Sequence, residues 1–202
     1  MKLFGLILML AAAPVWGQSM AGRYALSGVR EVGSELMLKP DGSFEYFLAY
    51  GAADYSATGS WKQEKDAVVL TTAGQDVAPF RLVKSAKTAN GVVRVWVKAP
   101  NGQPVPNIDV ALDGGSSART DSSGVALFPD EKTPRQVTFA IRVYQFRSEP
   151  IALTAGDNDF HFEIHGEAIT RVRFKGERLK IDGDALELRF WDPAKAMRYV
   201  RQ

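Results

Sequence analysis

The chain has 202 residues with no cysteine and two histidines, a composition that excludes several functions at once. Without a thiol it cannot use a cysteine nucleophile, an iron–sulfur cluster, a c-type haem attachment or a thiolate zinc site, and no disulfide can hold the fold together. The hydrophobic fraction of 46% and the charged fraction of 24% are ordinary for a globular chain, so apolar burial must stabilise it. The length suits one large β domain or two small domains.

The first residues have the pattern of an export signal. A positive residue precedes an apolar run of eleven residues at 3–13. This run fits the hydrophobic region of a signal peptide, whereas a membrane-spanning helix needs roughly 20 apolar residues. Val15 and Gly17 are small enough for the −3 and −1 positions of a cleavage site. Cleavage after Gly17 would remove residues 1–17, so we expect a secreted or periplasmic protein with no membrane span after cleavage.

The charge of the chain is nearly balanced. Loss of residues 1–17 removes Lys2 and no acidic residue, which lowers the formal net charge of +2 by one. A nucleic-acid-binding surface needs a clear basic excess, so no nucleic-acid partner is expected. Phosphate-cradling glycine motifs of the P-loop and dinucleotide-binding types are also absent from the sequence, and no cofactor is assigned.

From Arg23 onward, apolar and polar residues alternate with a period of two, which is typical of strands with one buried face. A Pro-Asp-Gly sequence at 40–42 marks a tight turn between two such strands. We interpret residues 20–84 as an antiparallel meander of about five or six strands, within a first segment of the domain that covers 18–88. Because the chain shows no convincing amphipathic helix, an all-β fold is predicted.

A second segment, residues 89–165, alternates strands with proline- and glycine-rich turns. A valine strand at 93–97 leads into the turn P-N-G-Q-P-V-P at 100–106, and a strand at 108–112 follows. The sequence T-D-S-S-G at 120–124 then turns into the next strand, and the alternation of Val137, Phe139, Ile141 and Val143 predicts the longest strand. Turns at this spacing predict a β-sandwich.

This turn chemistry resembles the carboxypeptidase regulatory-like, or prealbumin-like, domain over residues 90–165. The matching features are a turn of P-x-G-x-P-V-P type and a T-D-x-x-G sequence before the following strand. The resemblance implies a seven-stranded sandwich, usually an accessory module beside a partner domain, with structural roles for Gly102, Pro104, Asp121 and Gly124. Members attached to peptidases lack catalytic residues of their own, so the resemblance assigns no functional residue here.

Residues 166–202 return to a period of two, with turn signals at 176–177, 182–183 and 192–193. Three or four short strands are too few to bury a core independently. We therefore predict that they complete the sheet or barrel begun by residues 18–88, with an Ig/prealbumin-like sandwich inserted between the two parts. The alternative is that they extend an edge of the sandwich.

The split domain loosely resembles lipocalin-like meander barrels, because G-x-Y occurs near its start, at 22–24, and G-x-W at 59–61. The resemblance implies a barrel interior that encloses a small apolar ligand. The alternative is that the interior is filled by aromatic side chains: Tyr24, Phe44, Tyr46 and Trp61.

One strand carries both histidines of the chain. His161, Glu163 and His165 are spaced by two residues, so in a strand they share one face, and Asp159 lies in line with them. Two imidazoles and a carboxylate are reasonable ligands for zinc or copper. Adjacent same-face residues lie about 6.5–7 Å apart, so a fourth ligand would have to come from another element. The alternative is the solvated face of an amphipathic strand, and no metal is assigned.

The other catalytic patterns do not identify particular residues. Serine–histidine catalysis would have to use the same two histidines, and no G-x-S-x-G elbow occurs in the sequence. Any two acids could converge as in glycoside hydrolases, but nothing points to a particular pair. No catalytic residue is assigned, and a non-enzymatic protein is the leading prediction.

Two further patterns concern the surface. A row of basic residues lies near the C-terminus: Arg171, Arg173, Lys175, Arg178 and Lys180. This basic row could contact acidic lipid, polysaccharide or an acidic partner, or it could be the solvent-exposed face of a strand. A group of aromatic residues invites a carbohydrate-stacking hypothesis: Phe44, Tyr46, Phe47, Tyr50 and Tyr55. With a period of two, Phe44 and Tyr46 share the inward face of their strand and Phe47 does not.

The sequence thus predicts an exported binding or protein-interaction module whose partner is a protein, a cell-envelope component or a small ligand. The alternatives are a lipocalin-like carrier of a small apolar molecule and a hydrolase with a carboxylate- or histidine-based site. An enclosed apolar cavity in the first domain would favour the carrier, and convergent acids in a cleft would favour the hydrolase. A filled core with an exposed apolar patch would favour the interaction module.

Overall fold

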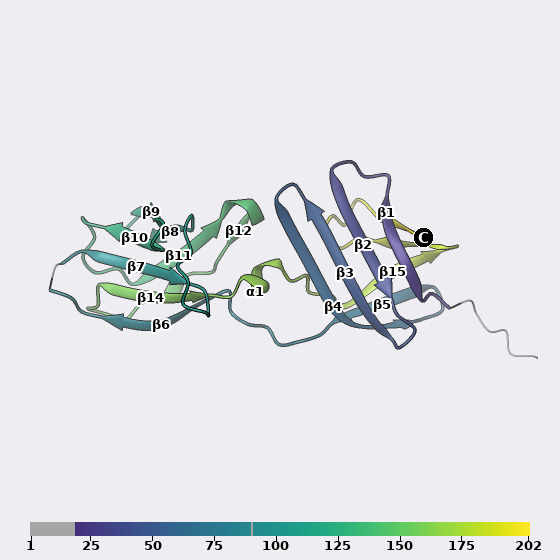
Figure 1. Ribbon diagram of the computed structural model, residues 1–202, viewed down its shortest axis with the longest axis horizontal. Helices are drawn as coiled ribbons and strands as arrows, with labels where there is room; N and C mark the ends of the chain where they lie inside the picture. Colours follow the sequence, from purple (N-terminus) through teal and green to yellow (C-terminus); the bar gives the residue numbers. More distant parts are fainter. Residues whose placement is uncertain (1–18, 90) are drawn as a thin grey trace, which may run out of the picture.

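The computed structural model describes residues 19–89 and 91–202, so the predicted signal segment 1–17 lies outside the described residues. Nearly all of the regular structure is β-sheet. A closed eight-stranded barrel lies beside a two-sheet sandwich, and the sandwich is inserted between the two parts of the barrel (Figure 1). The predicted fold class, an all-β chain with a barrel-like domain and an inserted sandwich, is confirmed.

The barrel is built from the two ends of the described chain. Its first five strands are β1 (Gly22–Ser27), β2 (Val32–Leu38), β3 (Ser43–Tyr50), β4 (Ala53–Gln63) and β5 (Ala67–Thr72). Its last three strands are β15 (Lys175–Asp182), β16 (Ala185–Leu188) and β17 (Met197–Arg201). The ring closes through two antiparallel pairs, β1 with β17 and β5 with β15. No edge strand is left within the barrel, because every one of its strands has two neighbours.

The inserted segment forms two sheets. The first has the order β10-β7-β14-β6 and contains β6 (Phe80–Ala86), β7 (Val93–Lys98), β10 (Val125–Phe128) and β14 (Asp159–Ile164). The second contains β8 (Asp109–Leu112), β9 (Ser117–Arg119), β11 (Gln136–Ile141), β12 (Phe146–Arg147) and β13 (Ile151–Ala152). A 3₁₀ helix, η1 (Arg142–Tyr144), follows β11, and α1 (Gly166–Thr170) leads back toward the barrel. In the described residues the two sheets have four and five strands, more than the seven that the family resemblance implied.

Strand β6 belongs to the sandwich and not to the first meander, which corrects the prediction for residues 80–84. It pairs antiparallel with β14, with Phe80 opposite Ile164 and Leu82 opposite Phe162. Phe80 is 4% exposed and stacks on Phe139 of the second sheet, with ring centroids 4.1 Å apart. Alternating apolar residues predict a strand but do not identify the sheet it joins. The chain therefore passes from barrel to sandwich before β6 begins.

The strand predicted to continue through Val143 ends earlier, at Ile141. The chain turns there into η1, and Gln145 adopts the left-handed conformation with φ 49°. Val143 is consequently 45% exposed instead of buried. This correction matters because η1 brings Tyr144 to the barrel.

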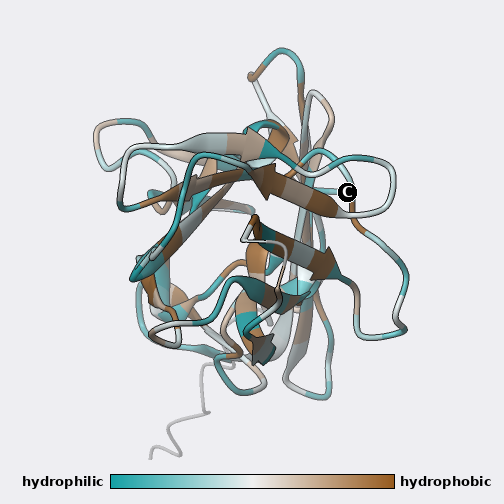
Figure 2. Cartoon of the chain, turned by 90° about the vertical axis from the view of Figure 1, so that its left-hand side faces the viewer, coloured by the Kyte–Doolittle hydropathy of each residue, from teal (hydrophilic) through white to brown (hydrophobic). Residues whose placement is uncertain are grey.

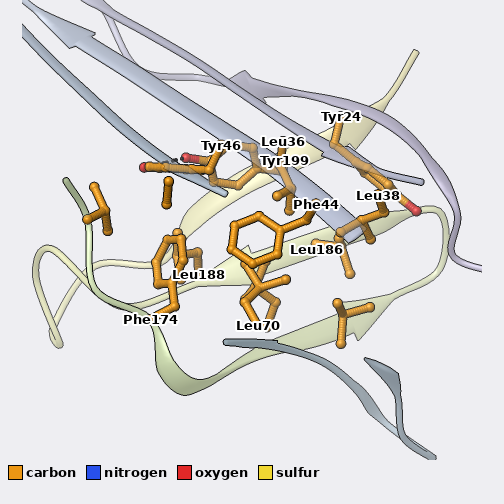
Figure 3. Close-up of a cluster of buried hydrophobic side chains, with 14 of the residues drawn as sticks. Tyr24, Leu36, Leu38, Phe44, Tyr46, Leu70, Phe174, Leu186, Leu188 and Tyr199 are labelled. Atoms are coloured by element: carbon orange, nitrogen blue, oxygen red, sulfur yellow. Dashed lines mark hydrogen bonds between the residues drawn. The ribbon is translucent and has the colours of Figure 1, made fainter. Parts of the chain in front are cut away.

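Hydrophobic residues are concentrated in the strands, and the loops are mostly hydrophilic (Figure 2). The barrel interior is occupied by side chains, and the labelled residues of Figure 3 converge on its centre from several strands. Phe44 and Tyr46 face inward at 1% and 2% exposure, as their spacing predicted. The largest fully buried side chains of the barrel are Tyr24, Tyr199, Phe44, Phe174, Leu36, Leu38, Leu70, Leu179 and Leu186.

Phe174 enters this core from outside the strands. It belongs to the segment 171–174 between α1 and β15, and its ring centroid lies 5.9 Å from that of Phe44 and 5.2 Å from that of Tyr46. Backbone hydrogen bonds fix the segment: the Val172 N–H donates to the Ser56 carbonyl at 2.8 Å, and the Thr72 N–H donates to the Phe174 carbonyl at 2.8 Å. The connection from the sandwich therefore becomes part of the barrel core.

At two glycines, backbone atoms of a neighbouring segment lie so close that a Cβ atom would not fit. A Cβ at Gly59 would lie 2.0 Å from the Thr71 carbonyl oxygen, so β4 and β5 could not keep their present distance with a larger residue there. Gly124 has φ +73°, and a Cβ would lie 2.5 Å from the Val97 carbonyl oxygen. In the same turn the Asp121 carboxylate accepts the Val125 N–H at 3.0 Å. The T-D-S-S-G sequence thus sets the turn into β10.

We predict that Phe174→Ala lowers the free energy of unfolding by about 3–5 kcal/mol, because it leaves a cavity among packed aromatic rings. Chemical denaturation followed by circular dichroism would measure the loss. Leu127→Ala on β10, where the side chain is 51% exposed, serves as the control and should change stability by less than about 1 kcal/mol. A similar small effect for both variants would show that Phe174 does not support the barrel.

Candidate functional site

The two histidines lie on the outer face of the β10-β7-β14-β6 sheet, as their spacing predicted. Phe160 and Phe162 alternate with them and are buried in the sandwich at 0% and 1% exposure. The side chains of His161, Glu163 and His165 are 25%, 22% and 17% exposed. The strand is therefore amphipathic, with its polar face only partly open to solvent.

Asp159 and His161 are held in a group centred on Trp96 of the neighbouring strand. The Trp96 indole Nε1–H donates to the Asp159 carboxylate at 2.8 Å, and the Arg94 Nε lies 3.5 Å from the same oxygen. The His161 ring stacks on the Trp96 ring, with centroids 5.4 Å apart and planes inclined by 1°. Its Nε2 lies 3.5 Å from the other carboxylate oxygen of Asp159. The carboxylate already has cationic and N–H partners.

Glu163 is paired in a similar way. Its carboxylate accepts a hydrogen bond from Arg81 at 2.8 Å and lies 2.9 Å from the His165 Nε2. The hydrogen bond from Arg81 lowers the pKa of the Glu163 carboxyl below its usual value, so the group is ionised at neutral pH. Within residues 19–89 and 91–202, no three His, Asp or Glu side chains are grouped so that they could hold a metal ion. The predicted set His161, Glu163 and His165 thus lies along one strand, with Glu163 paired to Arg81 and each histidine beside a carboxylate.

Two residues of the basic row, Arg173 and Arg178, are paired with acidic residues. Arg173 lies 2.9 Å from Asp76 in the segment that leaves β5. Arg178 pairs with Glu64 and, at 3.2 Å, with Asp66 in the turn before β5. Between the basic residues, Val172 and Phe174 are buried in the barrel core at 3% and 1% exposure. These pairings fit the interpretation of the basic row as the solvent-exposed face of barrel segments.

The five aromatic residues between positions 44 and 55 divide among three environments. Phe44 and Tyr46 lie in the barrel core, whereas Phe47 is 44% exposed on the outer side of β3. Tyr50 has the inward parity of Phe44 and Tyr46 but is 55% exposed at the end of the strand. Tyr55 of β4 is partly buried. They do not form one stacking platform, because neighbouring residues of a strand point to opposite faces.

A different aromatic cluster lies where the barrel meets the sandwich. We call it the rim cluster, and it consists of Tyr55, Tyr144, Phe190 and Trp191. The Tyr55 ring centroid is 5.3 Å from that of Trp191 and 6.0 Å from that of Tyr144, and Phe190 is 5.4 Å from Trp191. The Tyr55 hydroxyl donates to the Tyr144 carbonyl at 3.4 Å. Because Tyr144 belongs to η1, the rim cluster joins the sandwich to the barrel.

Trp191 combines exposure with a fixed position. It is 41% exposed, yet its Nε1–H donates to the Tyr46 hydroxyl at 3.0 Å. The Tyr46 hydroxyl lies 3.3 Å from that of Tyr199, which is 2.8 Å from Ser34 Oγ. Ser34 in turn donates to the Phe47 carbonyl at 2.6 Å. Burial raises the pKa of Tyr199 well above its usual value, so its hydroxyl stays protonated.

Comparisons of this chain with protein-family models, curated proteins and solved structures give no match. Among the described residues, no helix has the length and apolar character needed to cross a membrane.

The polar face of β14 could be located from the spacing of its residues, whereas the rim cluster could not. His161 and Glu163 share a face because of their spacing, which can be read locally. Tyr55 contacts Trp191 only because the barrel closes, and it contacts Tyr144 only because η1 turns toward β4. The Asp-Pro turn signal that follows Trp191 was the one local sign that this residue lies in a loop.

We predict that zinc does not stabilise the protein, because Asp159 and Glu163 are already paired with arginines and the histidines reach only neighbouring carboxylates. A thermal melt with and without excess zinc, on protein treated beforehand with a chelator, would measure this. A saturable rise in the melting temperature that disappears in His161→Gln would contradict the prediction and favour a metal site on β14.

Proposed function

We propose that this chain is an exported, non-enzymatic protein-interaction module of the periplasm or cell envelope, and that Trp191 is the anchor of its contact surface. The observation that carries the proposal is the combination of 41% exposure with fixed contacts at Trp191. Tryptophan and tyrosine dominate the residues that contribute most to protein interfaces. A side chain that is already held in place loses little conformational entropy when a partner covers it.

The surroundings of Trp191 support an apolar contact surface. Tyr50 ends β3 at the turn that leads to Tyr55 on β4, and its side chain is 55% exposed. Val143 precedes Tyr144 in η1 and is 45% exposed. Exposed apolar side chains therefore occur within five residues of Tyr55 on the barrel and next to Tyr144 on the sandwich. Such a patch is typical of interaction surfaces when it is contiguous.

The filled barrel favours this proposal over a lipocalin-like carrier. Phe44, Phe174 and Tyr199 occupy the barrel interior at 0–1% exposure, where a carried molecule would have to lie. The acids of β14 are neutralised by ion pairs instead of converging in a cleft, which favours a binding role over a hydrolase. On this view the sandwich, with its carboxypeptidase regulatory-like turns, is an accessory module attached to the barrel.

We predict that a photo-crosslinking amino acid at position 191, in the native host, gives a discrete crosslinked species on irradiation. The physical reason is that a partner's apolar surface covers Trp191 directly. The matched control is the same amino acid at position 83, because Val83 is 51% exposed on β6 of the sandwich. Crosslinked bands would be separated by electrophoresis and identified by mass spectrometry. Equal crosslinking at both positions, or none at 191, would contradict the proposed surface.

We also predict that the exported protein begins at Gln18. The apolar run at 3–13 would direct export, and the small residues Val15 and Gly17 would permit cleavage. Cell fractionation followed by N-terminal sequencing would measure both the location and the first residue. Recovery of the full-length chain from the cytoplasm would refute the export part of the proposal without bearing on the surface at Trp191.

A further inference from the structure

A pocket of about 430 Å³ lies at the end of the sandwich beside α1. This volume falls within the range of small-molecule sites, roughly 300–1,000 Å³. Ile108 and Ile164 are buried in the pocket wall at 3% and 7% exposure, and Val143 lies at its edge. The apolar part of the lining comes from four separate elements and their loops: Pro106, Ile108, Ile141, Val143, Ile164 and Ile169.

Two arginines and one aspartate define the charge at this pocket. Arg119 and Arg142 both line it, and their Nε atoms donate to the two oxygens of Asp109 at 2.8 and 2.7 Å. The hydrogen bonds from Arg119 and Arg142 lower the pKa of the Asp109 carboxyl, so it is ionised at neutral pH. One negative charge is therefore shared by two positive charges. Glu167 of α1 is exposed and does not line the pocket.

Arg142 is the freer of the two cations. Its side chain is 76% exposed, compared with 41% for Arg119. A guanidinium that is bound to its carboxylate through Nε keeps further N–H donors for another acceptor. Planar donors of this kind recognise carboxylates in a two-point arrangement. The pocket thus pairs an apolar interior with a cationic edge.

We propose that this pocket binds an amphipathic monocarboxylate, such as a medium-chain fatty acid, with its tail among the isoleucines and its carboxylate at Arg142. The apolar wall favours a hydrocarbon chain, because burial of apolar surface is the main favourable contribution to binding there. The surplus positive charge favours an anionic head group over a cationic one. The pocket shares Val143 and Tyr144 with the proposed partner surface, but Trp191, the proposed anchor of that surface, does not line it.

The first test is calorimetric titration of the purified full chain with decanoate below its micelle concentration. We expect saturable binding at one site. Decyltrimethylammonium, which has the same tail and the opposite charge, should bind about tenfold more weakly or not at all. Equal affinity for the two amphiphiles, or no saturable binding of decanoate, would overturn the proposal.

Variants then locate the site. Val143→Asp introduces a negative charge at the pocket edge and should weaken decanoate binding by about tenfold or more. Val83→Asp is the matched control, because Val83 is similarly exposed on a different face, and it should bind decanoate normally. Arg142→Gln should weaken decanoate but leave decanol binding unchanged, whereas Trp191→Ala should affect neither. Equal loss in Val143→Asp and Val83→Asp would show that binding occurs elsewhere and would overturn the assignment.

Discussion

The structure depends on the packing of Phe174 inside the barrel. The ring lies among Phe44, Tyr46 and Phe190, on a segment that is hydrogen-bonded to Ser56 on one side and Thr72 on the other. About a hundred residues, which include the whole sandwich, separate Thr72 from Phe174. The barrel core is therefore completed only after the inserted domain has returned the chain to it. Closing such a long loop costs conformational entropy, which the burial of Phe174 and the strands that follow it must offset.

The same insertion explains which parts of the fold could be predicted from sequence. Alternation and turn residues are local, so the inward direction of Phe44 and Tyr46 and the outward direction of Phe47 followed from spacing. The partner sheet of a strand is a long-range property. Phe80 alternates as a barrel strand would, but its ring packs on Phe139 of the sandwich. The end of β11 at Ile141 also depends on tertiary packing, because nothing in its apolar alternation signals a turn.

The candidate sites show the same division between local and long-range information. The shared face of His161 and Glu163 was predictable, but its chemistry was not. Arg81 reaches Glu163 from β6, and Trp96 reaches His161 and Asp159 from β7. These cross-strand partners turn a possible ligand set into a network of ion pairs and ring contacts. With no cysteine in the chain, the acids and the two histidines were the main candidates for metal or acid–base chemistry, and this pairing is the observation on which the proposed binding role rests for β14.

The position of the sandwich relative to the barrel depends on contacts and not on the helix that links them. With five residues, no side-chain cap and no buried residue, α1 is too short to be stable alone. Ile169 packs against the sandwich core, and Phe174 anchors the chain five positions later in the barrel. Tyr144 adds a second contact through Tyr55. A ligand beside Ile169 and a partner over the rim cluster would therefore act on the same junction, because both contact the few residues that hold the two bodies together.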